Sequence, residues 1–276
     1  MIVRVFPRRT NATPVDEYAF IGEPPLFIPD FDDVHVDITF TWDIEAGLNI
    51  AKSWERFGKP VKVGGVAMGT RGENFTPGLY LKPGYVITSR GCPGRCWFCD
   101  VWKREGDIRE LPITEGWNIL DSNLLACSEK HILNVLDMLQ KQPHAPEFTG
   151  GLDPRYMTID VLKEIKAVKP KQIFTAYDTE DDWQFIPGAI ANCWKAGFTK
   201  ESHAVRAFAL IGYPRDTFEQ AEIRLNRLMN LGIIPMAMLY RNEAGKVDRE
   251  WRQFQRTWAR PTITGSLVKC LAWEVE

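Results

Sequence analysis

The middle of the chain alternates between two kinds of hydrophobic pattern. Short runs rich in Val, Ile and Phe carry apolar residues at every second position, which predicts strands. Longer stretches carry them every three or four positions, which predicts amphipathic helices; the stretch 128–142 places Ile132, Val135 and Leu139 on one face. We expect strands at 85–90, 117–126, 146–153, 171–178, 203–214 and 233–240, with helices at 128–142, 158–168, 181–197 and 216–232.

Strands that are separated mostly by helices predict a parallel sheet with right-handed crossovers. The expected fold class is α/β, with a partial (β/α)6, TIM-like barrel over residues 84–241. The first crossover departs from this pattern, because residues 104–116 show no helical periodicity, and we expect its helix to be reduced or lost. The helix expected at 216–232 opens with Asp216 and Glu219 at the spacing of a capping box.

Residues 1–83 form a separate N-terminal extension. The first part, 1–33, is rich in proline and turn residues and predicts an irregular segment. A strand at 34–40, a helix at 43–58 and a strand at 61–65 then give one β-α-β unit. We therefore expect a short extension that packs on the barrel.

Residues 242–276 predict a helix and a tail. The stretch 245–261 places basic residues on one face of a helix and aromatic residues on another. Such a stripe could hold RNA, DNA or a phosphorylated substrate. It is more often the solvated face of a helix that packs on the core, and we favour that interpretation. The basic residues are Lys246, Arg249, Arg252, Arg256 and Arg260, and the aromatic residues are Trp251, Phe254 and Trp258.

Composition narrows the class of protein. The chain has 276 residues, of which 45% are hydrophobic, and this is enough for a packed core. The first residues carry charge and proline where a secretory signal has an apolar run, and no stretch reaches the apolar length of a membrane span. We therefore expect a cytoplasmic protein without membrane contact. A net charge of −2 argues against attraction of the whole surface to nucleic acid.

Three of the six cysteines, Cys92, Cys96 and Cys99, form a C-x3-C-x2-C run directly after a predicted strand. This clustering is unlike a secreted disulfide framework and favours reduced thiolates that bind metal. Zinc and iron-sulfur clusters both take thiolates, so the ligand type does not decide between them. A closed zinc site needs four ligands, and no second pair lies at a suitable spacing. Three thiolates on a four-iron cluster leave one iron open to react.

The run, with Phe98 just before its last cysteine, resembles the signature of the radical S-adenosylmethionine (radical SAM) enzymes. The segment "SRGCPGRCWFC" is most similar to the branch that contains methylthiotransferases and cobalamin-domain radical enzymes, and the resemblance extends over the predicted barrel. It implies a [4Fe-4S] cluster whose open iron binds S-adenosylmethionine. Reductive cleavage would then give a 5′-deoxyadenosyl radical that abstracts hydrogen from a substrate, with Phe98 beside the adenine.

The resemblance also implies contacts to S-adenosylmethionine at the strand ends. Members of the family often hold the amino group with Gly-Gly-Glu after the second strand, and this chain lacks that motif. "LDSN" at the end of the second predicted strand, favoured by strand order, or "TGGLD" at the end of the third could replace it. The candidates for the amino group are Asp121, Ser122 and Asn123, or Gly150 and Gly151. Asp153 or Asp178 could bind the ribose, and Ile211 and Gly212, in "LIGYP", could contact the adenine. Arg206 is the candidate for the carboxylate, unless it is only a charge at the entry end of its strand.

Two features of the related branch are missing from the sequence. No Asp-x-His-x-x-Gly stretch occurs, so we expect no cobalamin and interpret residues 1–83 as a shortened remnant of a cobalamin domain. No cysteine precedes Cys92, whereas methylthiotransferases carry a second N-terminal cluster. The substrate stays unidentified, with a small molecule or peptide slightly favoured over nucleic acid by the net charge. A reducing partner such as flavodoxin or ferredoxin is expected.

Cys127 is a candidate catalytic residue, because it lies on the side of the loops where substrate is expected and could donate a hydrogen atom. A lone cysteine is more often a small buried hydrophobe, and Cys193 is expected in the core. For the chain as a whole, the alternative is a non-catalytic iron-sulfur or zinc protein that senses redox state or scaffolds a partner.

Overall fold

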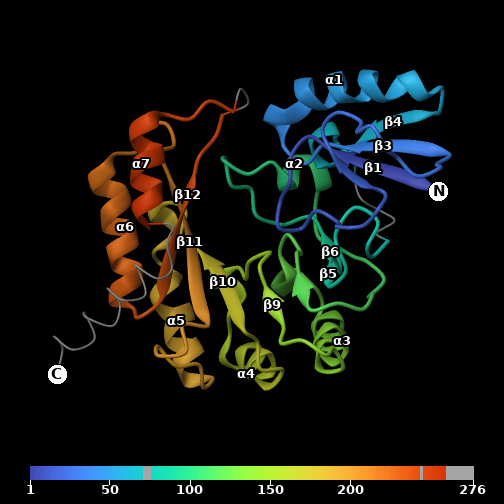
Figure 1. Ribbon diagram of the computed structural model, residues 1–276. Helices are drawn as coiled ribbons and strands as arrows, with labels where there is room; N and C mark the ends of the chain where they lie inside the picture. The colour runs from blue at the N-terminus through green and yellow to red at the C-terminus, as the bar shows by residue number, and fades with distance from the viewer. Residues whose placement is uncertain (71–75, 243–244, 259–276) are drawn as a thin grey trace.

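The computed structural model describes residues 1–70, 76–242 and 245–258. Figure 1 shows a small N-terminal sheet under α1 and, beside it, a larger sheet surrounded by helices. Within the described residues, none of the helices is both long and apolar enough to cross a membrane.

The larger sheet contains six parallel strands in the order β12-β11-β10-β9-β8-β5. Each strand pairs with the strands before and after it in this series, which is the arrangement of a (β/α) barrel, and β5 and β12 do not pair in the described part of the chain. The expected α/β fold with parallel strands is confirmed, as an open sheet. The strands are β5 (Tyr85–Val86), β8 (Asn118–Ile119), β9 (Glu147–Phe148), β10 (Gln172–Ala176), β11 (Val205–Ile211) and β12 (Ile234–Leu239).

Four helices follow one another around the outside of this sheet (Figure 1). Apolar side chains of the helices and strands interlock in one core between the two layers. Ser128 and Thr158 cap the first two helices, because their hydroxyl oxygens accept the N–H groups of His131 and Val161. Pro187 lies in the first turn of α5, where a missing N–H is tolerated, so that helix begins later than predicted. The helices are α3 (Glu129–Gln140), α4 (Ile159–Ala167), α5 (Ile186–Lys195) and α6 (Phe218–Asn230).

The start of α6 differs from the prediction. Thr217 is the N-cap and accepts the N–H of Gln220 at 3.2 Å. Asp216 instead accepts the N–H of Gly212 at 2.8 Å and forms an ion pair with Arg224, also at 2.8 Å. Both charged side chains are buried, with 0% and 1% of their surface exposed. The carboxylate read as a helix cap therefore fixes the loop after β11.

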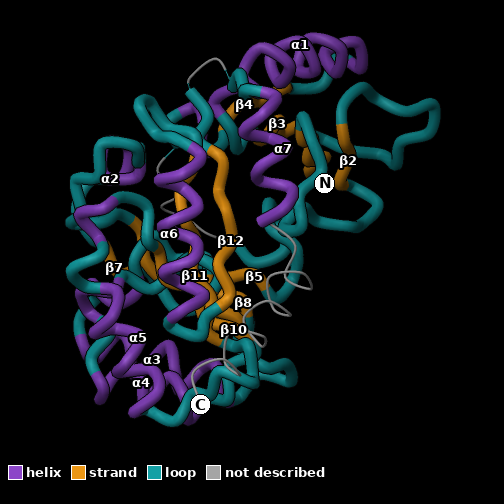
Figure 2. Tube along the Cα trace, turned by 90° about the vertical axis from the view of Figure 1, so that its left-hand side faces the viewer, coloured by secondary structure: helices purple, strands orange, loops and turns teal. Residues whose placement is uncertain are grey.

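The last described helix, α7 (Arg249–Trp258), packs its aromatic face against the end of β11 and β12. The ring of Trp251 lies so close to Gly212 that an added Cβ there would be 3.0 Å from it. Gln255 donates to the carbonyl of Ala237 at 3.1 Å, and β12 runs between α6 and α7 in the view of Figure 2. The arginines of α7 are exposed, so the interpretation as a solvated basic face is confirmed for the described residues. Arg260 lies outside them.

The first crossover has no long helix, as expected. After β5 the chain forms a hairpin of β6 (Ser89–Arg90) and β7 (Arg109–Glu110), which are antiparallel. The cysteine loop and the five-residue helix α2 (Val101–Glu105) lie between these two strands. The hairpin therefore closes the base of the cysteine loop.

The N-terminal extension is larger than the predicted β-α-β unit. Its four strands are parallel, in the order β2-β1-β3-β4, and α1 packs on them. The first two strands fall in the segment expected to be irregular. The central strand β1 is buried on both faces, so it shows no alternation that would have revealed it. The elements are β1 (Ile2–Phe6), β2 (Ala19–Ile21), β3 (Asp33–Asp37), β4 (Val61–Gly64) and α1 (Ile44–Trp54).

Two stacked aromatic rings and an arginine connect the extension to the larger sheet. Phe40 and Trp42, after β3, stack with ring centroids 4.8 Å apart. The guanidinium of Arg241, directly after β12, lies 4.8 Å from the centre of the Trp42 ring. The ends of β3 and β12 therefore meet on the side where the cysteine loop lies.

Candidate cofactor and active site

The cysteine loop begins with a turn that only glycine allows. Gly91 has a φ of 87°, and a side chain there would collide with the carbonyl of Asp107. The N–H of Cys92 then donates to the carbonyl of Gly106 at 3.1 Å, and the N–H of Cys99 donates to the carbonyl of Cys96 at 3.1 Å. These backbone bonds fold the loop back on itself.

The three thiols of the loop lie close enough to influence one another. A Cβ on Gly94 would be 3.3 Å from the Sγ of Cys92 and 3.8 Å from that of Cys96, so this glycine separates the two sulfurs. Partial burial and the neighbouring Cys99 together raise the pKa of Cys96 to about 11. Burial also raises the pKa of Cys99. Without a metal Cys96 and Cys99 therefore hold their protons at neutral pH, and a metal must displace those protons.

The donor set fits an iron-sulfur cluster. Three soft sulfur donors come from one short loop, which is the ligand chemistry that such clusters use. Among the described residues, no three His, Cys, Asp or Glu side chains converge on a point that could hold a single ion. A four-iron cluster does not need such convergence, because each thiolate binds a different iron.

Replacing Gly94 by alanine tests this packing. The new methyl group must push against the Sγ of Cys92 and the guanidinium of Arg155, which would lie 3.3 Å and 3.1 Å away. We expect Gly94→Ala to lower the iron bound after reconstitution several-fold while the thermal midpoint stays close to that of the native chain. Gly188→Ala, in α5, is the matched control, because nothing lies within 4 Å of its added methyl group. Equal iron contents in the two variants would contradict the proposed role of the loop.

The ends of β8 and β9 meet at Cys92. The side-chain amide of Asn123 donates to the carboxylate of Asp153 at 2.9 Å and to the Sγ of Cys92 at 3.4 Å. Arg155 binds Asp153 with two of its nitrogens, and this ion pair raises the pKa of the guanidinium. Asn123 is 2% exposed, and its carbonyl oxygen has no partner among the described residues. That oxygen is a buried acceptor beside a cysteine, and no described residue satisfies it.

Asp121 and Gly150, unlike Asn123, make contacts that stabilise the local structure at the ends of β8 and β9. The Asp121 carboxylate accepts from the N–H and the hydroxyl of Thr88, both at 2.6 Å, and from the hydroxyl of Ser89 at 2.7 Å. Burial raises the pKa of Asp121, and these hydrogen bonds oppose the rise. A Cβ on Gly150 would collide with the carbonyl of Asp121. Gly151 adopts a φ of 95°, which favours glycine. Among the residues predicted to hold an amino group, Asn123 is thus the one that contacts the cysteine loop, while no hydrogen bond joins Ser122 to the loop among the described residues.

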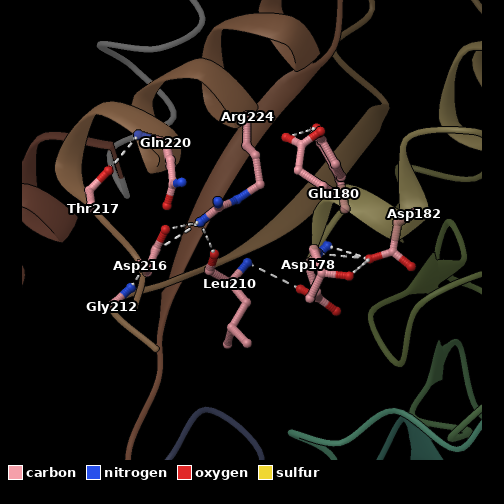
Figure 3. Close-up of polar contacts among 11 residues, drawn as sticks. Asp178, Glu180, Asp182, Leu210, Gly212, Asp216, Thr217, Gln220 and Arg224 are labelled. Carbon is pink, nitrogen blue, oxygen red and sulfur yellow. Dashed lines mark hydrogen bonds and ion pairs between the residues drawn. The ribbon is translucent and has the colours of Figure 1, made fainter. Parts of the chain in front are cut away.

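At the ends of the next two strands, β10 and β11, Asp178 and the loop after β11 are tied together (Figure 3). The carboxylate of Asp178 accepts the N–H of Leu210 at 3.1 Å, and Asp182 accepts the N–H of Asp178 at 2.9 Å. Burial and the nearby charge of Asp182 together raise the pKa of Asp178 to about 7. Ile211 is buried and Gly212 turns the chain with a φ of 71°. Both lie where the adenine segment is expected.

The pKa of Asp178 predicts a pH-dependent stability. A carboxyl whose folded pKa is raised favours the protonated form, so stability falls as pH rises from about 4, the unfolded pKa, to about 7. Asparagine keeps the shape and the acceptor for Leu210 without the charge. We expect Asp178→Asn to be more stable than the native chain by about 2–4 kcal/mol at pH 8, and nearly equal to it at pH 4. Urea unfolding at both values measures this, and a difference independent of pH would contradict it.

Arg206 and the two cysteines outside the loop lie elsewhere. Arg206 is at the entry end of β11, where its Nε donates to the carbonyl of His203 at 3.3 Å and its guanidinium lies over Phe174. It is thus at the opposite end of the strand from Gly212, and the structure does not bring it to the cysteine loop. Cys127 is half-buried, packs against the core and has its pKa raised to about 11 by burial. Cys193 is in the core, as expected, and Cys270 lies outside the described residues.

Sequence reasoning missed an aromatic group on the cysteine loop. The ring of Trp97 lies 5.6 Å from that of Tyr213 after β11 and 6.0 Å from that of Tyr240 after β12. Trp97 also meets Phe98 edge to face at 5.4 Å. These contacts join the loop to the ends of β11 and β12. The hydrogen bonds of Asn123 join the same loop to the ends of β8 and β9. The available signal was that each tyrosine lies at the end of a strand, Tyr240 directly after β12 and Tyr213 two residues past the end of β11.

Comparisons with known proteins give one solved structure of interest. No protein-family model matches the chain, and no curated protein matches it in sequence. Coproporphyrinogen III oxidase (HemN) from Escherichia coli, described as a radical SAM enzyme, is similar in structure with a TM-score of 0.40 and 15% sequence identity. The likeness covers 69% of this chain and 51% of that one, so the chain matches about half the length of that protein. It concerns the course of the backbone alone.

Proposed function

We propose that the protein is a radical SAM enzyme. The observation that carries the proposal is the placement of the C-x3-C-x2-C thiols at the end of a parallel sheet, with the unpartnered carbonyl oxygen of Asn123 beside Cys92. When bound, a [4Fe-4S] cluster with one open iron would supply the electron that cleaves S-adenosylmethionine to a 5′-deoxyadenosyl radical, which removes a hydrogen atom from substrate.

The residues of the chain would orient S-adenosylmethionine from two sides. Asn123 offers its carbonyl oxygen to the ammonium of the methionine part, and Asp153 lies within hydrogen-bond distance of Asn123 to complement that charge. On the other side, Gly212 and Ile211 present backbone for the adenine, and the Asp178 carboxyl can accept from ribose hydroxyls. The two sides are fixed independently, by Arg155 on one and by Arg224 on the other.

The loop itself would limit access of water to the reacting atoms. The rings of Trp97, Tyr213 and Tyr240 meet where the cysteine loop approaches the chain after β11 and β12, and Trp97 is 52% exposed. A carbon radical reacts with its nearest neighbour, and rings at this position would help to direct it. We propose that the substrate is a small molecule or peptide and that flavodoxin or ferredoxin supplies the electron, since the net charge of −2 gives no general attraction to nucleic acid.

Anaerobic reconstitution tests the proposal. We expect about four irons and four sulfides per chain, and formation of 5′-deoxyadenosine when dithionite and S-adenosylmethionine are added. A chain that takes up only zinc and releases no 5′-deoxyadenosine would instead be the metal-binding scaffold or sensor that the sequence left open.

A further inference from the structure

Arg90 sits directly before the cysteine loop, and among the described residues its guanidinium forms no ion pair. It lies on β6 opposite Arg109 on β7, so both side chains are on the same face of the hairpin. The Nε atoms of Arg90 and Arg109 are each buried without a hydrogen-bond partner. Among the described residues, no hydrogen bond or ion pair engages the terminal nitrogens of Arg90, and these are not sealed from solvent.

Every carboxylate near Arg90 is already engaged. Glu105, which is 3% exposed, pairs with Arg104 at 3.2 Å and with Arg109 at 3.1 Å. The others are held as follows: Asp107 by Arg95, Glu110 by the N–H of Ser128 and by His131, and Asp121 by Thr88 and Ser89. Two buried carboxylates, those of Glu105 and Asp121, therefore lie among three guanidinium groups, those of Arg90, Arg104 and Arg109.

This arrangement is unfavourable unless an anion completes it. Like charges directly opposite on paired strands repel each other, and a largely buried charge without a partner loses hydration that nothing replaces. Guanidinium groups bind carboxylate and phosphate oxygens through two parallel hydrogen bonds. The terminal nitrogens of Arg90 are the donors that remain free for such a bond.

We propose that Arg90, supported by Arg109, is a binding site for the carboxylate or phosphate group of a small molecule held beside the cysteine loop. Only Gly91 separates Arg90 from Cys92, so the anionic group would anchor a ligand next to the reacting centre. Its assignment to an acidic substrate rests on the proposed function, whereas binding of the anion does not depend on the cluster.

Arginine labelling of the native protein tests the site without any substitution. Phenylglyoxal labelling, located by peptide mass spectrometry, is expected to modify Arg90, and inorganic phosphate is expected to protect it against a background of potassium chloride at equal ionic strength. The exposed Arg249 on α7 should be labelled equally with and without phosphate. Labelling of Arg90 that phosphate does not change would overturn the proposal. An Arg90 that is never labelled would overturn it too, because its nitrogens would not be open to a ligand.

A charge-matched pair of variants measures the affinity. We expect the thermal midpoint of the native protein to rise with phosphate in a saturable manner. Arg90→Gln should weaken phosphate binding at least tenfold, and Arg249→Gln, which removes the same charge from an exposed helix, should leave it within twofold. Equal affinities in the two variants would show binding elsewhere. If Arg90→Gln does not fold, the labelling experiment on the native protein still decides.

Two adenosine compounds distinguish the sources of the anion. If S-adenosylhomocysteine protects Arg90 and 5′-methylthioadenosine, which has no carboxylate, does not, the site takes the amino-acid end of the cofactor. If phosphate alone protects it, the site serves an acidic substrate. A protein that cleaves no S-adenosylmethionine but still shows protection would refute the proposed function and leave the anion site standing.

Discussion

Replacing Cys92, Cys96 or Cys99 by alanine is expected to abolish iron binding and the formation of 5′-deoxyadenosine. Each sulfur would hold a different iron, so the loss of one leaves two ligands, too few to retain the cluster. The fold should survive, because the thiols are not in either hydrophobic core. Iron and sulfide analysis after anaerobic reconstitution gives the first readout, and chromatography of the nucleoside product gives the second.

Two other cysteines provide controls for this prediction. Cys127→Ala should keep the iron content of the native chain, because Cys127 lies beyond the cysteine loop and packs against the core. Cys193→Ala should also keep it, with some loss of stability from the cavity left by a side chain that is 0% exposed. Loss of iron from Cys127→Ala would mean that the ligands are misassigned.

Removing the buried charge of Arg224 is expected to lower the free energy of unfolding by about 3–5 kcal/mol. Arg224 pairs with Asp216 and donates to the carbonyl of Leu210 at 3.0 Å. Its guanidinium also lies 5.1 Å from the centre of the Tyr213 ring. With methionine at this position, the carboxylate of Asp216 stays buried without a counter-charge, and the loop that carries Gly212 loses its support.

Arg227 on the same helix supplies the matched control. Arg227→Met removes an identical group, but its ion pair with Glu180 is largely exposed, at 36% and 59%. Exposed pairs contribute about 1 kcal/mol or less, so the loss should be correspondingly small. Urea unfolding of both variants gives the comparison, and equal losses would show that burial of the Asp216 pair does not matter. Affinity for S-adenosylmethionine should fall only in Arg224→Met.

The strands of the larger sheet and the helices between them could be predicted from the sequence. Apolar residues recur at every second position in those strands and at every third or fourth position in the helices, because helices cover one side of the sheet. The strand β1 could not, since it is buried on both faces and carries no period. The role of Asp216 was misread for a related reason: its spacing to Glu219 satisfies a local rule, whereas its partner Arg224 is a neighbour that sequence spacing alone does not single out.

In the candidate site, too, local patterns could be predicted from the sequence, whereas contacts between distant residues could not. The three cysteines are adjacent in the sequence, so their spacing already indicates a metal site. The contact of Asn123 with Cys92 joins residues far apart in the chain, and strand order indicates the segment 120–123 without showing which of its side chains meets Cys92. Asp121 had been grouped with Asn123, yet its three hydrogen bonds to Thr88 and Ser89 depend on how β8 lies beside β5.

The order of the strands also bears on how the protein is made. Each strand of the larger sheet pairs with the one synthesised before it, from β5 to β12, so the sheet can grow in step with translation. The cysteine loop leaves the ribosome well before its neighbours Tyr213 and Tyr240. Until those two residues are made, the loop lacks its aromatic contacts. We expect this interval to be the time when iron and sulfide can enter most easily, and also when oxygen can reach the sulfurs.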